Sequence, residues 1–218
     1  MKLSLLFVLT VSIVASAQTG EWVSLFDGKS FAGWSQPGGK APEAGWMVED
    51  GMIHLKGKGG NLITEKQYGT FELEWEWKLA EGANNGVKYW VVPIGEKKEY
   101  LGIEYQMIDD KRHQDALRGG SHTTACIYDI KEAVADKPVK PAGEWNVSKI
   151  VVKGTKLEHW LNGMKVAEAD TASQEWKDLV AKSKFKSKPG FAPGKGHIML
   201  TDHQDETWYR SIRIKELQ

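Results

Sequence analysis

Residues 70–79 read Thr-Phe-Glu-Leu-Glu-Trp-Glu-Trp-Lys-Leu, and this stretch decides the fold. Large apolar residues occupy every odd position from 71 to 79, and charged residues occupy every even position from 72 to 78. Because successive side chains of a β-strand point to opposite faces of a sheet, the pattern predicts a strand with one face on a core. Antiparallel sheets commonly bury one face in this way.

Short segments of the same kind continue on both sides of this strand. Asp50-Gly51 and Asn162-Gly163 each separate two apolar segments, and both are typical hairpin turns because Gly accepts the positive φ that such turns need. We expect the last two strands, 197–201 and 207–214, to pair and close the sheet. Together the segments indicate an all-β fold, an antiparallel sandwich or jelly roll. The other strands are expected at 87–92, 100–108, 150–152, 157–161 and 164–168.

One segment has a helical spacing instead. Trp176, Leu179 and Val180 recur at three- and four-residue intervals, and Thr171 with Gln174 can form a capping box. The sequence therefore predicts one short helix near residues 172–183. Four lysines follow at alternate positions from 182 to 188, and we interpret them as a solvated loop.

Composition narrows the class of protein. The 218 residues hold 29 Lys and Arg against 29 Asp and Glu, so no net field attracts a nucleic acid. A hydrophobic fraction of 41% is ordinary for a globular chain. No internal repeat or linker interrupts residues 18–218, which we expect to form one domain. Cys126 is the single cysteine, which excludes an intrachain disulfide and a zinc-cysteine cluster.

The first 17 residues have the features of an export signal. Lys2 is followed by an apolar run from Leu3 to Ala15, and Ala15 and Ala17 are small residues at a cleavage site. The apolar run is shorter than the roughly 20 residues that a membrane span needs, so no membrane anchor is expected. We predict a signal peptide over residues 1–17, cleavage near Ala17, and a periplasmic or secreted protein.

Candidate chemical groups gather near residue 104 and near residue 203. Glu104 and Gln106 share one face of the predicted strand 100–108, and Asp109 follows where that strand ends. A carboxylate in a partly apolar groove makes a useful base, although an ion pair with a lysine of the neighbouring strand explains Glu104 equally well. His113 lies in the loop that follows, and His203 ends a strand. Three residues of that last segment are candidate ligands of a divalent cation: Asp202, His203 and Asp205.

Glu72, Glu74 and Glu76 offer a different reading. They share one strand face, which is similar to the acidic strand of laminarinase-type retaining glycosidases. Two residues four apart on a strand lie about 13 Å apart at Cα, whereas a retaining pair needs carboxyl groups about 5 to 5.5 Å apart. An ordinary retaining glucanase is thus an alternative that requires strong convergence of side chains.

Many short blocks in order resemble the 3-keto-disaccharide hydrolase family across almost all of residues 18–218. The first half carries residues 24–29 (Ser-Leu-Phe-Asp-Gly-Lys), Gly33-Trp34, Glu76-Trp77-Lys78 and residues 84–87 (Asn-Asn-Gly-Val). The second half carries residues 104–109 (Glu-Tyr-Gln-Met-Ile-Asp), His113, Asp115, residues 127–129 (Ile-Tyr-Asp), 141–146 (Pro-Ala-Gly-Glu-Trp-Asn), 160–163 (Trp-Leu-Asn-Gly), 196–198 (Gly-His-Ile) and Asp202-His203.

The resemblance implies a concanavalin A-like jelly roll that acts on glycosides whose sugar is oxidised at C3. A C3 ketone acidifies the C2 hydrogen, so one base can start a β-elimination of the glycosidic oxygen, and water then adds to the enone. The expected catalytic residues are Glu104 and His203, with a divalent cation as an optional helper and no other cofactor. Expected substrate contacts come from Glu76, Asn85, Lys88, Gln106, Asp109, His113 and Trp145.

A non-catalytic lectin-like module is the rival reading from another class. Jelly rolls can bind glycans by stacking sugar rings on tryptophan. Trp77, Trp90 and Trp145 are the candidate platforms, although we expect at least two of the three to be buried in the core.

Overall fold

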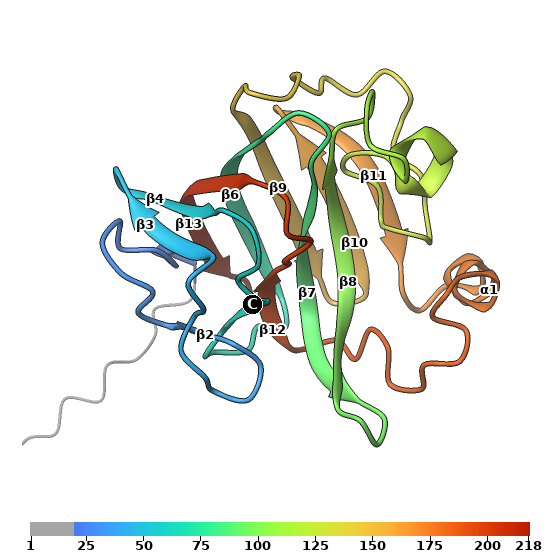
Figure 1. Ribbon diagram of the computed structural model, residues 1–218. Helices are drawn as coiled ribbons and strands as arrows, with labels where there is room; N and C mark the ends of the chain where they lie inside the picture. The colour runs from blue at the N-terminus through green and yellow to red at the C-terminus, as the bar shows by residue number, and fades with distance from the viewer. Residues whose placement is uncertain (1–19) are drawn as a thin grey trace, which may run out of the picture.

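The computed structural model describes residues 20–218, so the predicted signal peptide lies outside the described residues. Almost all regular structure in the described part is β, with a single α-helix and two short 3-10 turns (Figure 1). The strands are β1 (Trp22–Ser24), β2 (Trp34–Ser35), β3 (Trp46–Glu49), β4 (Met52–Leu55), β5 (Leu62–Thr64), β6 (Phe71–Leu79), β7 (Asn84–Ile94), β8 (Glu99–Ile108), β9 (Asn146–Lys153), β10 (Lys156–Leu161), β11 (Met164–Asp170), β12 (His197–Leu200) and β13 (Thr207–Glu216).

Two antiparallel sheets form a jelly-roll sandwich, as the sequence predicted. The eight-stranded sheet runs β11-β10-β9-β6-β13-β4-β3, with β1 added to β13. The five-stranded sheet runs β2-β5-β12-β7-β8. In Figure 1, β7 and β8 lie in front of β9 and β10, and α1 (Gln174–Lys182) lies beside the sandwich.

The core lies between the sheets and is built from the odd positions of the central strands. Along β6 the apolar side chains are buried and the charged ones are partly exposed, in strict alternation. Ile103, Tyr105 and Met107 of β8 are fully buried against this layer, and Trp75 meets Tyr105 edge to face at 4.9 Å between ring centroids. Burial of such large side chains is the main stabilising term of a sandwich.

Both predicted hairpin turns are confirmed. Asp50 and Gly51 have φ of 49° and 72°, and Asn162 and Gly163 have φ of 47° and 88°. These positive values at both turn positions match the right-handed twist of the strands. They set the register of β3 with β4 and of β10 with β11.

Two details of the sequence prediction are wrong. The last two strands do not pair with each other, because β12 lies between β5 and β7 in one sheet and β13 lies between β6 and β4 in the other. The helix cap is Ser173, whose hydroxyl accepts the Trp176 N–H at 3.0 Å. Thr171 instead donates its hydroxyl to the Thr155 carbonyl.

Two further observations concern membrane-spanning helices and the single cysteine. Among residues 20–218, no helix is both long and apolar enough to cross a membrane. The Cys126 thiol is buried and free, and burial raises its pKa. Its sulfur donates a hydrogen bond to the Ser121 carbonyl, so it is a structural thiol.

Candidate active site on the five-stranded sheet

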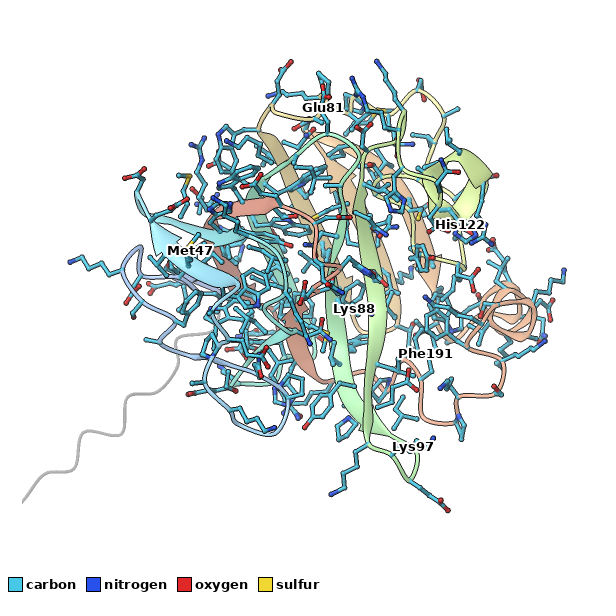
Figure 2. All side chains as sticks on the ribbon, in the orientation of Figure 1. Met47, Glu81, Lys88, Lys97, His122 and Phe191 are labelled. Carbon is cyan, nitrogen blue, oxygen red and sulfur yellow. The ribbon has the colours of Figure 1, made fainter. Side chains whose placement is uncertain are left out.

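Polar residues gather on the side of the five-stranded sheet that faces away from the sandwich interior. In the β7–β8 pair, Lys88 lies opposite Glu104 and Gly86 lies opposite Gln106. The Lys88 Nζ is 3.5 Å from Glu104 Oε2, and the two side chains are 18% and 4% exposed. We call Lys88, Glu104, Gln106 and their neighbour Tyr128 the polar face; Figure 2 labels Lys88 on β7.

Glycine at position 86 makes room for the carboxylate. A Cβ at Gly86 would lie 2.5 Å from Glu104 Oε1, closer than real Cβ contacts. The small residue therefore lets the Glu104 side chain lie across β7 toward Lys88. Gln106 is buried beside it, and its side-chain oxygen accepts no hydrogen bond from any described residue.

Residues 125–128 pair with the outer edge of β8, although the sequence did not predict them to be extended. Tyr105 bridges to Ile127, Ala125 donates its N–H to the Gln106 carbonyl, and Tyr128 donates its N–H to the Glu104 carbonyl. Since Ile127 is buried in the core, Tyr128 next to it lies on the opposite side, with Glu104.

His203 reaches this face from the loop between β12 and β13. Asp202 accepts the N–H groups of Gly59 and Gly60 at 2.9 and 2.7 Å, and Asp205 accepts the Asn84 N–H at 2.8 Å. These bonds tie the loop down on both sides of His203, which itself stays exposed.

The charges around His203 set its protonation. Although much of His203 is accessible to solvent, neighbouring atoms partly desolvate its imidazole and so lower its pKa; the Glu104 carboxylate opposes this shift and the Lys88 ammonium reinforces it. The imidazole is thus mainly neutral near neutral pH. Glu104 and Lys88 are the charged groups that act most strongly on the pKa of the His203 imidazole.

The structure does not support the predicted cation site. The carboxylates of Asp202 and Asp205 are engaged by backbone N–H groups, as described above. Among the described residues, no group of three His, Cys, Asp or Glu side chains is arranged to hold a metal ion. A site for a divalent cation would need carboxylate oxygens that are free to bind it.

Sequence reasoning assigned Tyr128 and Lys184 no role at the polar face. The Tyr128 hydroxyl donates to Asp115 Oδ2 at 2.8 Å, and the Lys184 Nζ lies 4.1 Å from the centroid of the Tyr128 ring. His122, labelled in Figure 2, lies with its Nδ1 3.4 Å from Asp115. Partial burial raises the pKa of Asp115, but bonds from Tyr128, Arg118 and His122 outweigh it and hold that pKa below its usual value.

Glu76 and Trp145, expected to contact substrate, lie on the other sheet. The Glu76 carboxylate accepts two hydrogen bonds from Arg210, at 2.9 and 2.7 Å, and the guanidinium of Arg210 lies 4.0 Å from the Trp145 ring centroid. Partial burial raises the pKa of Glu76, but the bonds and charge of Arg210 bring it below its usual value. Since β6 and β13 belong to the eight-stranded sheet, these groups are separated from Glu104 by the core.

The same ion pairs remove the arrangement that a retaining glucanase needs. Glu74 accepts two bonds from Arg213, as Glu76 does from Arg210. Each of these two carboxylates is therefore held by its own arginine. Trp77 and Trp90 are fully buried, as expected, and only Trp145 of the three is partly exposed.

Asn85 and Asp109 also lie away from the polar face, whereas His113 belongs to the loop that contacts Tyr128 through Asp115. Asn85 is fully buried between the sheets, where it donates to the Thr207 hydroxyl and accepts from the Thr201 hydroxyl. Asp109 ends β8 and accepts the N–H groups of Gly82 and Lys111. His113 accepts the Asp115 N–H and so shapes the loop of residues 110–129, which we call the covering loop.

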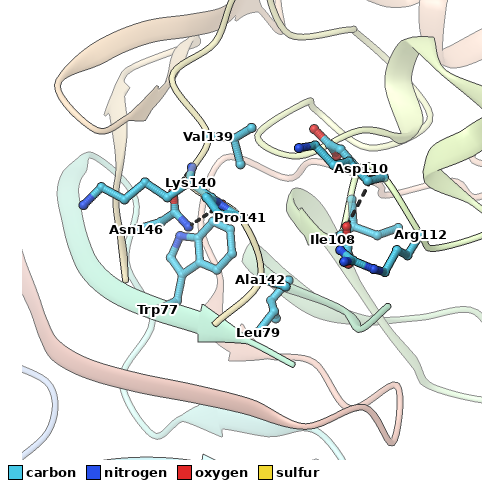
Figure 3. Close-up of a pocket in the computed structure, with 12 residues that line it drawn as sticks. Trp77, Leu79, Ile108, Asp110, Arg112, Val139, Lys140, Pro141, Ala142 and Asn146 are labelled. Atoms are coloured by element: carbon cyan, nitrogen blue, oxygen red, sulfur yellow. Dashed lines mark hydrogen bonds and ion pairs between the residues drawn. The ribbon is translucent and has the colours of Figure 1, made fainter. Parts of the chain in front are cut away.

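Asp109 borders a small cavity at the end of the sandwich (Figure 3). Its volume is about 80 Å³, far below the roughly 300 Å³ at which small-molecule sites begin. Its walls are largely apolar, with Trp77, Leu79, Ile108 and Val139 among them. It is therefore a packing gap rather than a substrate site.

Comparisons with known proteins agree with this architecture. A 3-keto-disaccharide hydrolase of Bacteroides thetaiotaomicron is 33% identical over an alignment 228 residues long, gaps included, that covers 90% of this chain and 78% of that protein. A crystal structure of a candidate glycosyl hydrolase from Parabacteroides distasonis superposes with a TM-score of 0.82 at 33% identity, covering 91% of this chain and 94% of that one. A carbohydrate-binding module from Bacillus subtilis shares the fold alone, with a TM-score of 0.51 at 10% identity over 84% of this chain and 96% of that one.

The family comparison covers nearly all described residues. The 3-keto-alpha-glucoside-1,2-lyase-like domain matches residues 21–215, from β1 to the end of β13. The match includes both sheets and every residue of the polar face. The chain therefore belongs to the family of the 3-keto-alpha-glucoside-1,2-lyase-like domain.

Proposed function

We propose that the chain is a carbohydrate-active enzyme that cleaves the glycosidic bond of 3-keto-glycosides on the polar face. The observation that carries this proposal is the Lys88–Glu104 pair, a buried carboxylate 3.5 Å from an ammonium with the exposed His203 beside it. The family membership and the name of the Bacteroides relative support the substrate class.

The chemistry needs a base, a donor for an enolate oxygen and a proton for the leaving group. The base takes the C2 proton of the 3-keto sugar, and the electrons of the C2–H bond form the enolate on O3. The enolate then expels the glycosidic oxygen from C1, leaving an enone, and the leaving oxygen takes up a proton. Water adds to C1 of the enone and C2 regains a proton, which gives the free 3-keto sugar.

The charges of the site suit His203 as the base. Because its pKa is lowered, the imidazole is ready to accept a proton near neutral pH. Glu104 stabilises the imidazolium that forms and also holds the Lys88 ammonium in place. Lys88 can then donate a hydrogen bond to the developing enolate oxygen, where a fixed positive charge lowers the barrier most.

Cleavage of a 3-keto-disaccharide and of its unoxidised parent tests the proposal. We expect cleavage of the 3-keto-disaccharide alone, and a loss of about 10²–10⁴-fold in kcat in each of the variants Glu104→Gln and His203→Gln. Glu99→Gln, an exposed position at the start of the same strand, is the matched control and should keep full activity.

Other outcomes would select the rival functions. Binding of the 3-keto-disaccharide without release of product would favour a lectin-like module, and cleavage of the unoxidised parent would favour an ordinary glucanase. Full activity in Glu104→Gln would remove that residue from the site even if the substrate class were right.

A further inference from the structure

Lys184 is itself exposed, as expected for the lysine-rich segment, but its backbone is anchored at the edge of the polar face. Its two neighbours in sequence, Ser183 and Phe185, are each 5% exposed. The Lys184 N–H donates to Asp129 Oδ2 at 2.6 Å, and Phe185 stacks on Phe191 with ring centroids 4.0 Å apart. The backbone at this position is therefore fixed to the covering loop and to the core.

The Lys184 ammonium lies over the ring of Tyr128, a residue of the polar face. Its Nζ lies 4.1 Å from the Tyr128 ring centroid, and the Tyr128 N–H is bonded to the Glu104 carbonyl at 3.1 Å. The Tyr128 hydroxyl is engaged by Asp115, so the ring is fixed as a support for the ammonium. Tyr128 and His203 thus lie on opposite sides of the Lys88–Glu104 pair, along the order β12, β7, β8 and segment 125–128.

The charges that face the ammonium favour release of its proton. The Lys184 side chain is accessible to solvent, but partial desolvation by its neighbours lowers its pKa; the Glu104 carboxylate raises it and the Lys88 ammonium lowers it further, with smaller raising effects from Asp129 and Asp115. The net shift is downward. An ammonium with a lowered pKa is a better general acid near neutral pH than an ordinary lysine.

We propose that Lys184 is a further catalytic residue, the general acid that protonates the leaving glycosidic oxygen. This inference rests on the proposed function and assigns the proton that the elimination requires. As the C1–O bond breaks, its electron pair stays on the oxygen, which takes a proton from Nζ and leaves Lys184 as a neutral amine. His203 holds the proton taken from C2, and exchange with water returns both groups to their starting states.

Lys88 is less suited to this role. Its Nζ lies 3.5 Å from Glu104, and it lies in the strand between His203 and Tyr128. Its ammonium is already engaged by a carboxylate, which suits a fixed charge beside an enolate oxygen. The two lysines therefore divide the work, with Lys88 at the enolate oxygen and Lys184 at the leaving oxygen.

The dependence of cleavage on the leaving group tests the assignment. We would compare a 3-keto-disaccharide, whose sugar alcohol is a poor leaving group, with a 4-nitrophenyl 3-keto-glucoside, whose phenolate leaves without help. In Lys184→Met we expect kcat for the disaccharide to fall about 100-fold or more, and kcat for the nitrophenyl glucoside to change less than about 5-fold. Lys186→Met, an exposed lysine of the same segment, should leave both rates unchanged.

A second variant separates proton transfer from charge. Lys184→Arg keeps a positive charge but is a very weak acid, so it should behave like Lys184→Met. Full disaccharide cleavage in Lys184→Arg, or an equal loss for both substrates in Lys184→Met, would overturn the assignment while leaving the proposed function intact. If the wild-type protein cleaves neither 3-keto substrate, the proposed function fails first.

Discussion

Glu104 is the residue on which the polar face depends, because its carboxylate acts on three neighbouring cationic or ionisable groups. It pairs with Lys88, and it opposes the effect of burial on the pKa values of His203 and Lys184. A single buried carboxylate thus pairs with Lys88 and influences the pKa values of two groups from other parts of the chain. Placing it there requires the missing Cβ of Gly86.

The pH dependence of catalysis follows from His203. The base must be unprotonated, so kcat/KM should fall as the pH falls through the pKa of His203, and the midpoint should lie below the ordinary value of 6.5 because burial lowers it. In Glu104→Gln the carboxylate that favours the imidazolium is gone, so the fall in the residual kcat/KM should move to a still lower pH.

Measuring kcat/KM for the 3-keto-disaccharide from pH 4 to 8 checks this prediction. Glu99→Gln serves as the control and should keep the wild-type midpoint. A midpoint that stays in place in Glu104→Gln, or a limb that persists in His203→Gln, would show that another group is the base.

The sequence identified part of this site and missed the rest for a physical reason. Glu104 and Gln106 could be predicted because strand alternation puts them on one face, and His203 because it ends a strand. Lys184 and Tyr128 belong to loops, and only the bonds to Asp129 and to the Glu104 carbonyl bring them over that face. No periodicity encodes such long-range loop contacts.

At the scale of elements, local signals predicted hairpins well and pairing between distant strands poorly. Asp50-Gly51 and Asn162-Gly163 specify their turns by backbone conformation alone. Strands β12 and β13 are close in sequence, yet the loop that carries His203 takes the chain from one sheet to the other. That loop has no hairpin turn, and its anchors at Gly59 and Gly60 lie far away in sequence.

His159 connects elements of both sheets through the core. Its Nε2 lies 3.1 Å from the Tyr89 hydroxyl of β7, and its Nδ1 lies 3.1 Å from the Ala125 carbonyl beside β8. Complete burial lowers the pKa of His159 from 6.5 to about 4. The unfolded chain therefore binds a proton between these pH values that the folded chain does not.

This difference predicts a loss of stability in mild acid. Since one pKa unit corresponds to 1.36 kcal/mol, His159 should lower the free energy of unfolding by about 3 kcal/mol between pH 6.5 and pH 4. Urea unfolding across this range measures the effect. His159→Gln should be less stable at pH 7 but should show a shallower fall with acid. An equal fall in both proteins would contradict the role given to His159.

At the scale of the molecule, the two outer faces of the sandwich differ in chemistry. The eight-stranded sheet presents Glu74 and Glu76, each paired with an arginine, whereas the five-stranded sheet presents the Lys88–Glu104 pair with His203 and Lys184 beside it. The alternation along residues 71–79 correctly predicted a sandwich, but it could not tell which outer face holds the candidate site. The signal peptide over residues 1–17 and export from the cytoplasm stay predictions.

The central claim is that the polar face removes a hydrogen from C2 of an oxidised sugar. Cleavage of a 3-keto-disaccharide in D₂O, with rapid mass analysis of the released 3-keto sugar, tests it most directly. We predict one deuterium at C2 of the product, above the level in 3-keto sugar kept in the same buffer without protein. Product that forms as fast as in ordinary water but carries hydrogen at C2 would mean direct displacement at C1 and would contradict the account.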